Sequence, residues 1–168
     1  STMNTIRCDE CRELLLAVSY YREEINPSTR TPETWLHVAT RIHRFDIARA
    51  EYVSHVEVPD AGMRREHVGA SELEIPSPPY EFLGNTRSGH LFFLKPEEAN
   101  SYELLVLDAR GREQARRLLT VEDHDLYFKK LALSEEGVLV GLLGLYDGAR
   151  VVWWRGDRLT EGSADARR

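Results

Sequence analysis

Two β-prone runs joined by Asp147-Gly148 constrain the fold of this chain more than any other feature. The runs cover residues 138–146 and 149–154 and are rich in Val, Leu, Tyr and Trp. An Asp-Gly pair between such runs is the strongest short-range signal of a hairpin, because a type I′ turn needs positive φ at both central residues. We therefore expect an antiparallel β-hairpin here.

A third β-prone run precedes this hairpin and ends at a glycine. Residues 127–133 lead into Ser134-Glu135-Glu136-Gly137. The final glycine can adopt the left-handed conformation that a tight turn requires. The sequence thus predicts three consecutive antiparallel strands, and a short run at 157–160 can follow them as a fourth.

The same pattern occurs once more upstream. Residues 82–89 match the run and glycine turn of 131–137, so that Gly89 and Gly137 are 48 residues apart. A further apolar run closed by Arg-Gly follows in both segments, at 102–107 and at 151–154. This spacing predicts two equivalent sheet-forming units.

A weaker third unit opens the chain. Its expected strands are residues 13–21, 35–46 and 52–59, with a turn-rich loop at 26–32. Phe45-Asp46 corresponds to Leu107-Asp108 of the second unit. Apolar residues in these segments also fall at helical spacing, so helices over 11–25 and 32–48 remain an open alternative.

The length of 168 residues is that of one domain. We expect a single domain over residues 1–160, built of repeats at about 8–59, 79–119 and 127–160. Residues 60–78 contain several glycines and prolines and are expected to connect the first two repeats. The small and charged residues 161–168 are expected to form a disordered tail.

Units with this order of strands and glycine turns resemble the blades of β-propellers. They are most similar to the divergent blades of bacterial six-bladed propellers of the NHL type, and residues 79–159 carry most of the resemblance. There is no Trp-Asp ending and no paired-glycine signature. The resemblance implies an all-β fold of antiparallel sheets with two to three propeller-like blades. The alternative is an α+β fold with one or two N-terminal helices on an antiparallel sheet.

Closed propellers contain about four to eight blades. Two or three blades would leave sheet edges open, and open edges pair with other strands. The resemblance therefore implies self-association, a place in a larger propeller, or some other packing of the sheets.

Charge and hydropathy exclude two classes of partner. The net charge is -6, with 22 basic and 28 acidic residues spread evenly, so no basic patch is expected to bind nucleic acid. The longest apolar run, residues 138–146, is far shorter than the about 20 residues of a membrane-spanning helix. We expect no nucleic-acid partner and no membrane insertion.

The sequence contains no recognisable catalytic motif. Neither Gly-x-Ser-x-Gly nor a phosphate-binding glycine loop is present. The nearest arrangement is Arg87-Ser88-Gly89-His90, which is more typical of a loop between two strands. We predict no catalytic residue, no cofactor and no enzymatic activity.

Cys8 and Cys11 form the one Cys-x-x-Cys pair of the chain. Two thiolates are half of a zinc site, and the six histidines are scattered singly, so no metal site is predicted. A disulfide or redox pair remains open. Arg155-Gly156-Asp157 spells an adhesion tripeptide, yet an ordinary turn accounts for it.

The aromatic residues are the strongest candidates for a binding surface. Trp153 and Trp154 are adjacent on a predicted strand and must point to opposite faces, so one of them is expected outside the core of its own sheet. Together with Trp35 and Tyr146 they are the predicted interaction residues. The predicted function is a non-enzymatic protein-interaction module that binds another protein or itself. The alternative is a small-ligand-binding α+β domain of a bacterial envelope or cytoplasmic protein.

Overall fold

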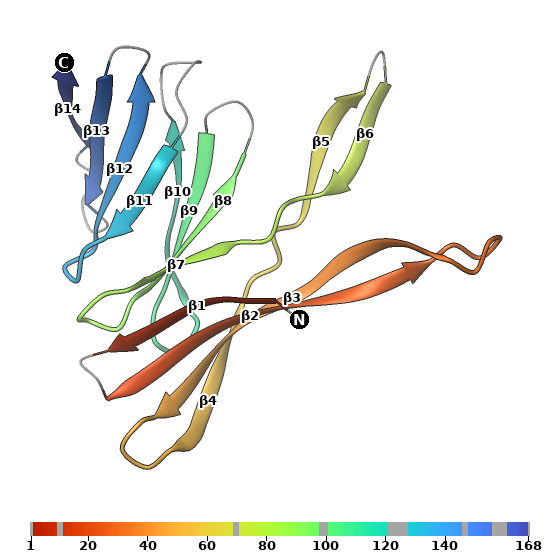
Figure 1. Ribbon diagram of the computed structural model, residues 1–168, viewed down its shortest axis with the longest axis horizontal. Helices are drawn as coiled ribbons and strands as arrows, with labels where there is room; N and C mark the ends of the chain where they lie inside the picture. The colour runs from red at the N-terminus through yellow and green to blue at the C-terminus, as the bar shows by residue number, and fades with distance from the viewer. Residues whose placement is uncertain are drawn as a thin grey trace. The chain divides into compact units, whose positions relative to one another are not determined.

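The computed structural model describes residues 2–9, 12–68, 71–97, 101–120, 128–145, 148–155 and 161–167. Within these residues the chain consists of β-strands and connecting turns, and every strand pairing is antiparallel (Figure 1). The predicted all-β class is confirmed, and the α+β alternative is wrong. The described ranges contain no helix long and apolar enough to cross a membrane.

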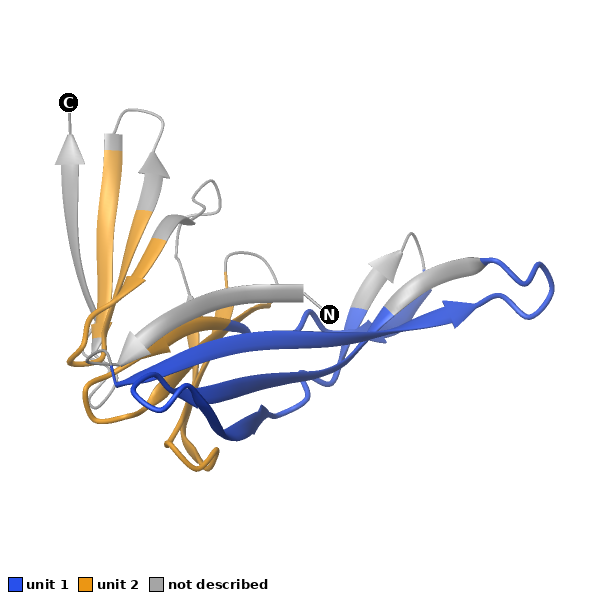
Figure 2. Ribbon diagram, turned by 60° about the horizontal axis from the view of Figure 1, so that its bottom comes forward, with its two compact units in different colours: residues 1–81 blue, residues 82–168 orange. Residues whose placement is uncertain are grey.

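The chain divides into two compact units, residues 1–81 and 82–168 (Figure 2). Each unit has its own sheets. We describe them one at a time.

Unit 1 begins with a four-stranded sheet in which each strand pairs with the next in sequence. Its strands are β1 (Thr2–Asp9), β2 (Glu13–Ile25), β3 (Pro32–Asp46) and β4 (Glu51–Val58). A separate two-stranded hairpin follows, formed by β5 (Met63–Val68) and β6 (Ser71–Pro76). This hairpin occupies most of the segment that the sequence predicts as a connection.

The strand interpretation of the N-terminal segments is confirmed, and the helical alternative is wrong. Along β2, the residues Leu15, Ala17 and Ser19 are buried while their neighbours are half-buried. This alternation has the period of two that defines a strand. Apolar residues on both faces produced the apparent helical spacing, because neighbouring positions are then apolar as well.

Unit 2 contains two four-stranded sheets, again with each strand paired to the next. The first consists of β7 (Glu81–Asn85), β8 (Leu91–Pro96), β9 (Ser101–Leu107) and β10 (Glu113–Thr120). The second consists of β11 (Phe128–Leu133), β12 (Val138–Leu145), β13 (Gly148–Arg155) and β14 (Glu161–Arg167).

The hairpin predicted around Asp147-Gly148 is present as β12 and β13. Gly148 pairs with Leu145, so this glycine is the first residue of a strand and not a turn residue. Tyr146 and Asp147 lie outside the described residues.

The turns that contain Gly89 and Gly137 have the same hydrogen bonds. In the first, the Thr86 amide donates to the His90 carbonyl at 2.9 Å, and the Gly89 amide donates to the Thr86 carbonyl at 3.0 Å. In the second, the corresponding bonds of Ser134 and Gly137 measure 2.8 and 3.1 Å. Both glycines have positive φ, 83° and 85°, which explains why glycine is required there.

The hydroxyl groups of the first residue in each turn make equivalent hydrogen bonds. Thr86 Oγ1 accepts a hydrogen bond from the His90 amide, and Ser134 Oγ accepts one from the Val138 amide, both at 3.1 Å. Side chains of this kind stabilise turns by satisfying a backbone donor locally. The two glycines therefore occupy equivalent bends, as the spacing of 48 residues predicts.

Two strands of unit 2 fall where the sequence predicts none. β10 carries Glu, Gln and Arg, and its backbone pairs with β9 from Thr120 to Glu113. Residues 161–167, expected as a disordered tail, pair with β13 as β14. An open strand edge offers a row of backbone donors and acceptors that a neighbouring segment of almost any composition can satisfy. The short run at 157–160 lies outside the described residues.

The core of unit 2 lies between its two sheets. Strands β8, β9 and β10 contribute one side of it and strands β11, β12 and β13 the other. The buried members of this cluster are Phe92, Leu94, Leu104, Val106, Leu119, Leu133, Leu139, Val152 and Trp154.

Candidate functional site

The two adjacent tryptophans of β13 point to opposite faces of their sheet. Trp154 is paired with Leu139 and Trp153 with Val140. Trp154 is only 4% exposed and belongs to the core between the sheets. The structure thus places Trp154 in the core and corrects its prediction as a contact residue, whereas Trp153 is half-buried on the other face.

The side chains of the other two predicted contact residues lie outside what the structure describes. Trp35 lies in β3 opposite Glu23, and its side chain lies outside the described part of the molecule. Tyr146 lies outside the described residues altogether.

Trp153 belongs to an apolar surface that we call the outer face. The outer face consists of the side chains on β12 and β13 that point away from the core of unit 2, namely Val140, Leu142, Val151 and Trp153. Leu142 is 40% exposed, and the other three are half-buried. Four large apolar side chains thus lie together on a sheet face that is incompletely covered.

The neighbouring sheet has a matching surface that is fully covered. Leu94 pairs with Leu104 and Phe92 with Val106, just as Leu142 pairs with Val151 and Val140 with Trp153. Phe92, Leu94, Leu104 and Val106 are all buried in the core cluster. The same register positions are therefore buried in the sheet β7–β10 and partly open in the sheet β11–β14.

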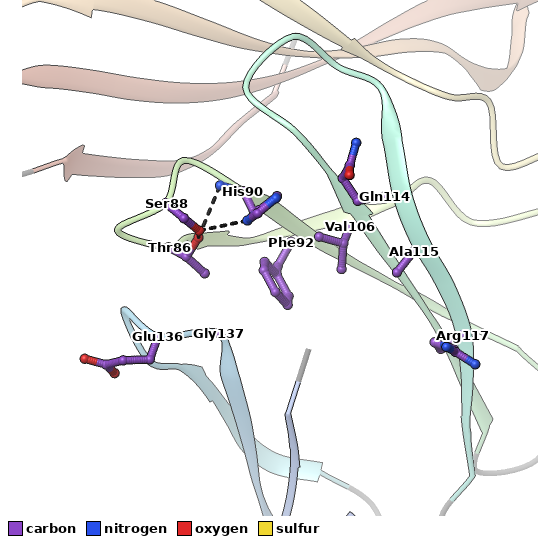
Figure 3. A pocket seen from close by; sticks show the side chains of 10 residues that line it. All are labelled: Thr86, Ser88, His90, Phe92, Val106, Gln114, Ala115, Arg117, Glu136 and Gly137. Carbon is purple, nitrogen blue, oxygen red and sulfur yellow. Dashed lines mark hydrogen bonds between the residues drawn. The ribbon is translucent and has the colours of Figure 1, made fainter. Parts of the chain in front are cut away.

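A pocket opens at one end of the core of unit 2, with a volume of about 400 Å³ (Figure 3). Its apolar lining comes from Phe92, Val106 and Ala115, and its polar lining includes Thr86, Ser88, His90 and Gln114. Arg117 and Glu136 also border it, but their charged ends point away from the other labelled side chains (Figure 3).

A chain of hydrogen bonds runs along the polar wall of this pocket. Thr86 Oγ1 lies 2.9 Å from Ser88 Oγ, which lies 2.8 Å from His90 Nδ1. A serine nucleophile needs a base that is itself oriented by a third group. No such acid is bonded to His90 among the described residues, and the Ser88–His90 bond lies within one turn. The arrangement can bind a polar group, but it is not a catalytic triad.

Unit 1 carries a cluster of imidazole and phenol side chains on one face of its sheet. The Tyr20 hydroxyl lies 2.8 Å from His43 Nε2, and the Tyr52 hydroxyl lies 2.9 Å from His55 Nδ1. The rings of the cross-strand pair His43 and His55 have centroids 5.7 Å apart. Arg41 lies over the ring of Tyr20 at 5.2 Å, in the geometry of a cation–π contact.

Burial lowers the pKa of His43, and the neighbouring His55 and Arg41 lower it further. Burial also lowers the pKa of His37, although the charge of Asp60 opposes this shift. Both shifts favour neutral imidazoles, which here hydrogen-bond to hydroxyl groups of Tyr20 and Thr40.

The described residues contain no group of three His, Cys, Asp or Glu side chains able to hold a metal ion. Cys8 lies in β1 opposite Leu14, and Cys11 is outside the described residues. The Arg155-Gly156-Asp157 tripeptide likewise lies only partly within them.

The sequence interpretation considered Ser88 and His90 but missed the other pocket residues and the aromatic face of unit 1. Phe92 and Gln114 belong to different strands and come together only through the pairing of β8, β9 and β10. His43 and His55 share one face through cross-strand register. The one sequence signal for this face was the spacing of His43 and Phe45, which are two positions apart and therefore point to the same face of a strand.

No family model matches the sequence, and no curated protein matches it significantly.

Proposed function

We propose that this chain is a non-enzymatic protein-interaction module of propeller-like blades, with the outer face as its contact surface. The main support is the contrast between Leu94 and Leu142, which occupy matching positions. Leu94 is 5% exposed and Leu142 is 40% exposed. A contiguous, partly open apolar patch on a sheet face is typical of a protein contact site.

The chemistry of the outer face agrees with this role. Its side chains are aliphatic except for Trp153, and tryptophan is enriched among residues that dominate binding energy. A strand pair that is apolar on both faces is typical of a sheet covered on both sides. In this sheet, one covering layer is the core of unit 2, and a partner would supply the other.

The proposal of a non-enzymatic role rests on the pocket. Its Ser88 and His90 bond to each other within the turn that positions them, and the charged side chains at its border point outward. The Ser88 hydroxyl and the His90 imidazole therefore have a role in stabilising the turn, and this role needs no reaction with a substrate.

Binding of bis-ANS, a dye that fluoresces on exposed apolar surface, tests the contact surface. We expect the folded chain at submicromolar concentration to bind the dye, and Leu142→Lys to remove most of that binding. The matched control is Leu118→Lys on β10, because Leu118 is 64% exposed but lies outside the outer face. Equal dye binding by all three proteins would contradict the proposal.

A second candidate function is the binding of a small uncharged molecule in the pocket of unit 2. The observation that favours it is the combination of an apolar floor at Phe92 and Val106 with hydroxyl and imidazole groups on the wall. Pockets that bind small molecules combine an apolar lining with a few polar groups in this manner.

An NMR titration tests this second function. Small neutral amides and cyclic alcohols should shift the amide signals of Ser88, His90 and Gln114, and Ala115→Trp should abolish the shifts by filling the pocket. Shifts that persist in Ala115→Trp, or that spread over both units, would contradict the assignment.

A further inference from the structure

We infer that His43 and His55 bind a divalent transition-metal ion, Cu²⁺ in preference to Zn²⁺, on one face of the sheet β1–β4. The site lies within unit 1, so it goes beyond the proposed function and does not depend on it. The histidines are scattered singly in the sequence, and the antiparallel pairing of β3 with β4 brings these two together.

The separation of the two imidazole rings suits a shared metal ion. His43 and His55 are directly opposite each other, so their side chains leave the sheet on the same face. Their ring centroids are 5.7 Å apart, and the ring planes are inclined at 41°. A metal ion held at about 2.0–2.1 Å by one nitrogen of each ring would keep the centroids roughly 5–6 Å apart at tetrahedral or wider angles. One ion can therefore bridge the pair at the separation that the sheet sets.

A tyrosine holds each ring at one of its two nitrogens. The Tyr20 hydroxyl lies 2.8 Å from His43 Nε2, and the Tyr52 hydroxyl lies 2.9 Å from His55 Nδ1. Where the hydroxyl accepts this bond, the lone pair is on the other nitrogen, Nδ1 of His43 and Nε2 of His55. Histidines that ligate metals are usually oriented in this manner, by a partner at the second nitrogen.

The pair is accessible to an ion from solvent. His55 is exposed, and Tyr52 is 51% exposed. The part of the chain that the structure describes offers no third His, Cys, Asp or Glu for the same ion, so water would fill the other coordination positions. Imidazole suits both Cu²⁺ and Zn²⁺, and where the protein does not enforce a geometry Cu²⁺ binds more tightly.

The charges around the pair permit a bound cation. Arg41 is the cation of this cluster, and its guanidinium forms an ion pair with Glu57 at 2.8 Å. The carboxylate offsets the charge of Arg41, and the whole chain has a net charge of -6. The field of the protein therefore does not oppose the approach of a metal ion.

Isothermal titration calorimetry of the full chain tests the site, with ZnCl₂ in one series and CuCl₂ delivered as its glycine complex in another. Cys8→Ser/Cys11→Ser is the parent for all measurements, because thiolates would also bind these ions. We expect one ion per chain and tighter binding of Cu²⁺ than of Zn²⁺. A parent that binds neither ion would overturn the inference, and tighter binding of Zn²⁺ would overturn the stated preference.

Substitution of either histidine should remove the site. His43→Gln and His55→Gln should each weaken Cu²⁺ binding by about a hundredfold or more, because loss of even an orienting partner costs about 10–100-fold. The matched control is His37→Gln, which should bind like the parent. His37 also lies in β3 and lies 2.8 Å from a hydroxyl, that of Thr40, but its ring contact is with Tyr21 and not with a second imidazole.

Far-UV circular dichroism confirms that each histidine variant is folded. Equal weakening by all three substitutions would overturn the inference, and so would a loss in only one of His43→Gln and His55→Gln.

The two tyrosines are positioning residues, and their role has a separate test. Tyr20→Phe and Tyr52→Phe should each weaken Cu²⁺ binding by about tenfold, while the electron paramagnetic resonance spectrum of the bound ion still shows two nitrogen ligands. Tyr21→Phe should have no effect, because Tyr21 contacts His37 instead. Unchanged affinity in Tyr20→Phe and Tyr52→Phe would overturn the positioning role, and a spectrum with a single nitrogen ligand in the parent would overturn the site itself.

Discussion

The two sheets of unit 2 have the same register and the same glycine turn, but they differ in how far their matching apolar faces are covered. Leu94 in β8 is 5% exposed, and Leu142 at the matching place in β12 is 40% exposed. Identical local geometry thus accompanies different burial. The comparison teaches that the strand pattern specifies a sheet with two apolar faces, and that the proposed contact surface lies where one of those faces is left partly open.

The largest effect is expected from Leu94→Ala. Truncation of a buried leucine removes apolar contacts and leaves a cavity, at a cost of about 2–5 kcal/mol. Leu142→Ala makes the same chemical change at the matching open position and should cost less than about 1 kcal/mol in the monomer. Urea denaturation at submicromolar concentration measures both.

Equal losses for these two variants would break the comparison. They would mean that Leu142 is as well packed as Leu94 in the monomer.

The next effect concerns the two turn glycines. Alanine at either site must adopt positive φ, which costs about 1–2 kcal/mol. A Cβ at Gly137 would also lie 3.4 Å from Thr86 Cγ2 and 3.5 Å from Phe92 Cζ, whereas at Gly89 the nearest atom is Ala109 Cβ at 3.7 Å. All three distances are ordinary van der Waals contacts, so Gly137→Ala and Gly89→Ala should lower the thermal midpoint by similar amounts. A loss confined to one site would show that the two turns are not equivalent.

A smaller effect is expected from the ion pair that joins the two turns. Arg87 and Glu135 are both exposed, so Arg87→Ala should cost between about 0.2 and 1 kcal/mol. The loss of stability should be smaller in 0.5 M NaCl. The backbone hydrogen bond from the amide of residue 87 to the Glu135 carbonyl should persist in the variant. A larger loss that salt does not change would indicate a packing role for the arginine.

The smallest effect is expected to be a pH dependence of the stability of unit 1. The pKa of His43 is lowered by burial, and His55 and Arg41 add to the shift. The folded chain then binds fewer protons than the unfolded chain, so stability is full above the ordinary pKa of 6.5 and falls as the pH drops through the lowered pKa. His43→Gln should flatten this fall in urea midpoints between pH 8 and pH 5, and an unchanged slope would contradict the assignment to His43.

Much of the fold follows from the sequence because strand pairs with strong turn signals are local. The hairpin of β12 and β13 and the bends at Gly89 and Gly137 depend on residues close together in the chain. The opposite directions of Trp153 and Trp154 follow from the pleat alone.

The remaining strands depend on neighbours that a local pattern does not show. β10 contains Glu113, Gln114 and two arginines, residues that favour helices, yet it pairs with the apolar strand β9. β1, β5 and β14 have similarly polar compositions. The pocket and the open faces were not predicted either, because they depend on which sheet covers which.

Quenching of Trp153 by acrylamide tests the central claim most directly. The chain has three tryptophans, so Trp35→Phe/Trp154→Phe leaves Trp153 alone, and Trp35→Phe/Trp153→Phe leaves Trp154 alone as the core reference. We predict that acrylamide quenches Trp153 readily, because its side chain is half-buried, and that Trp154 in the core is protected. Equal protection of Trp153 and Trp154 from acrylamide would contradict the account.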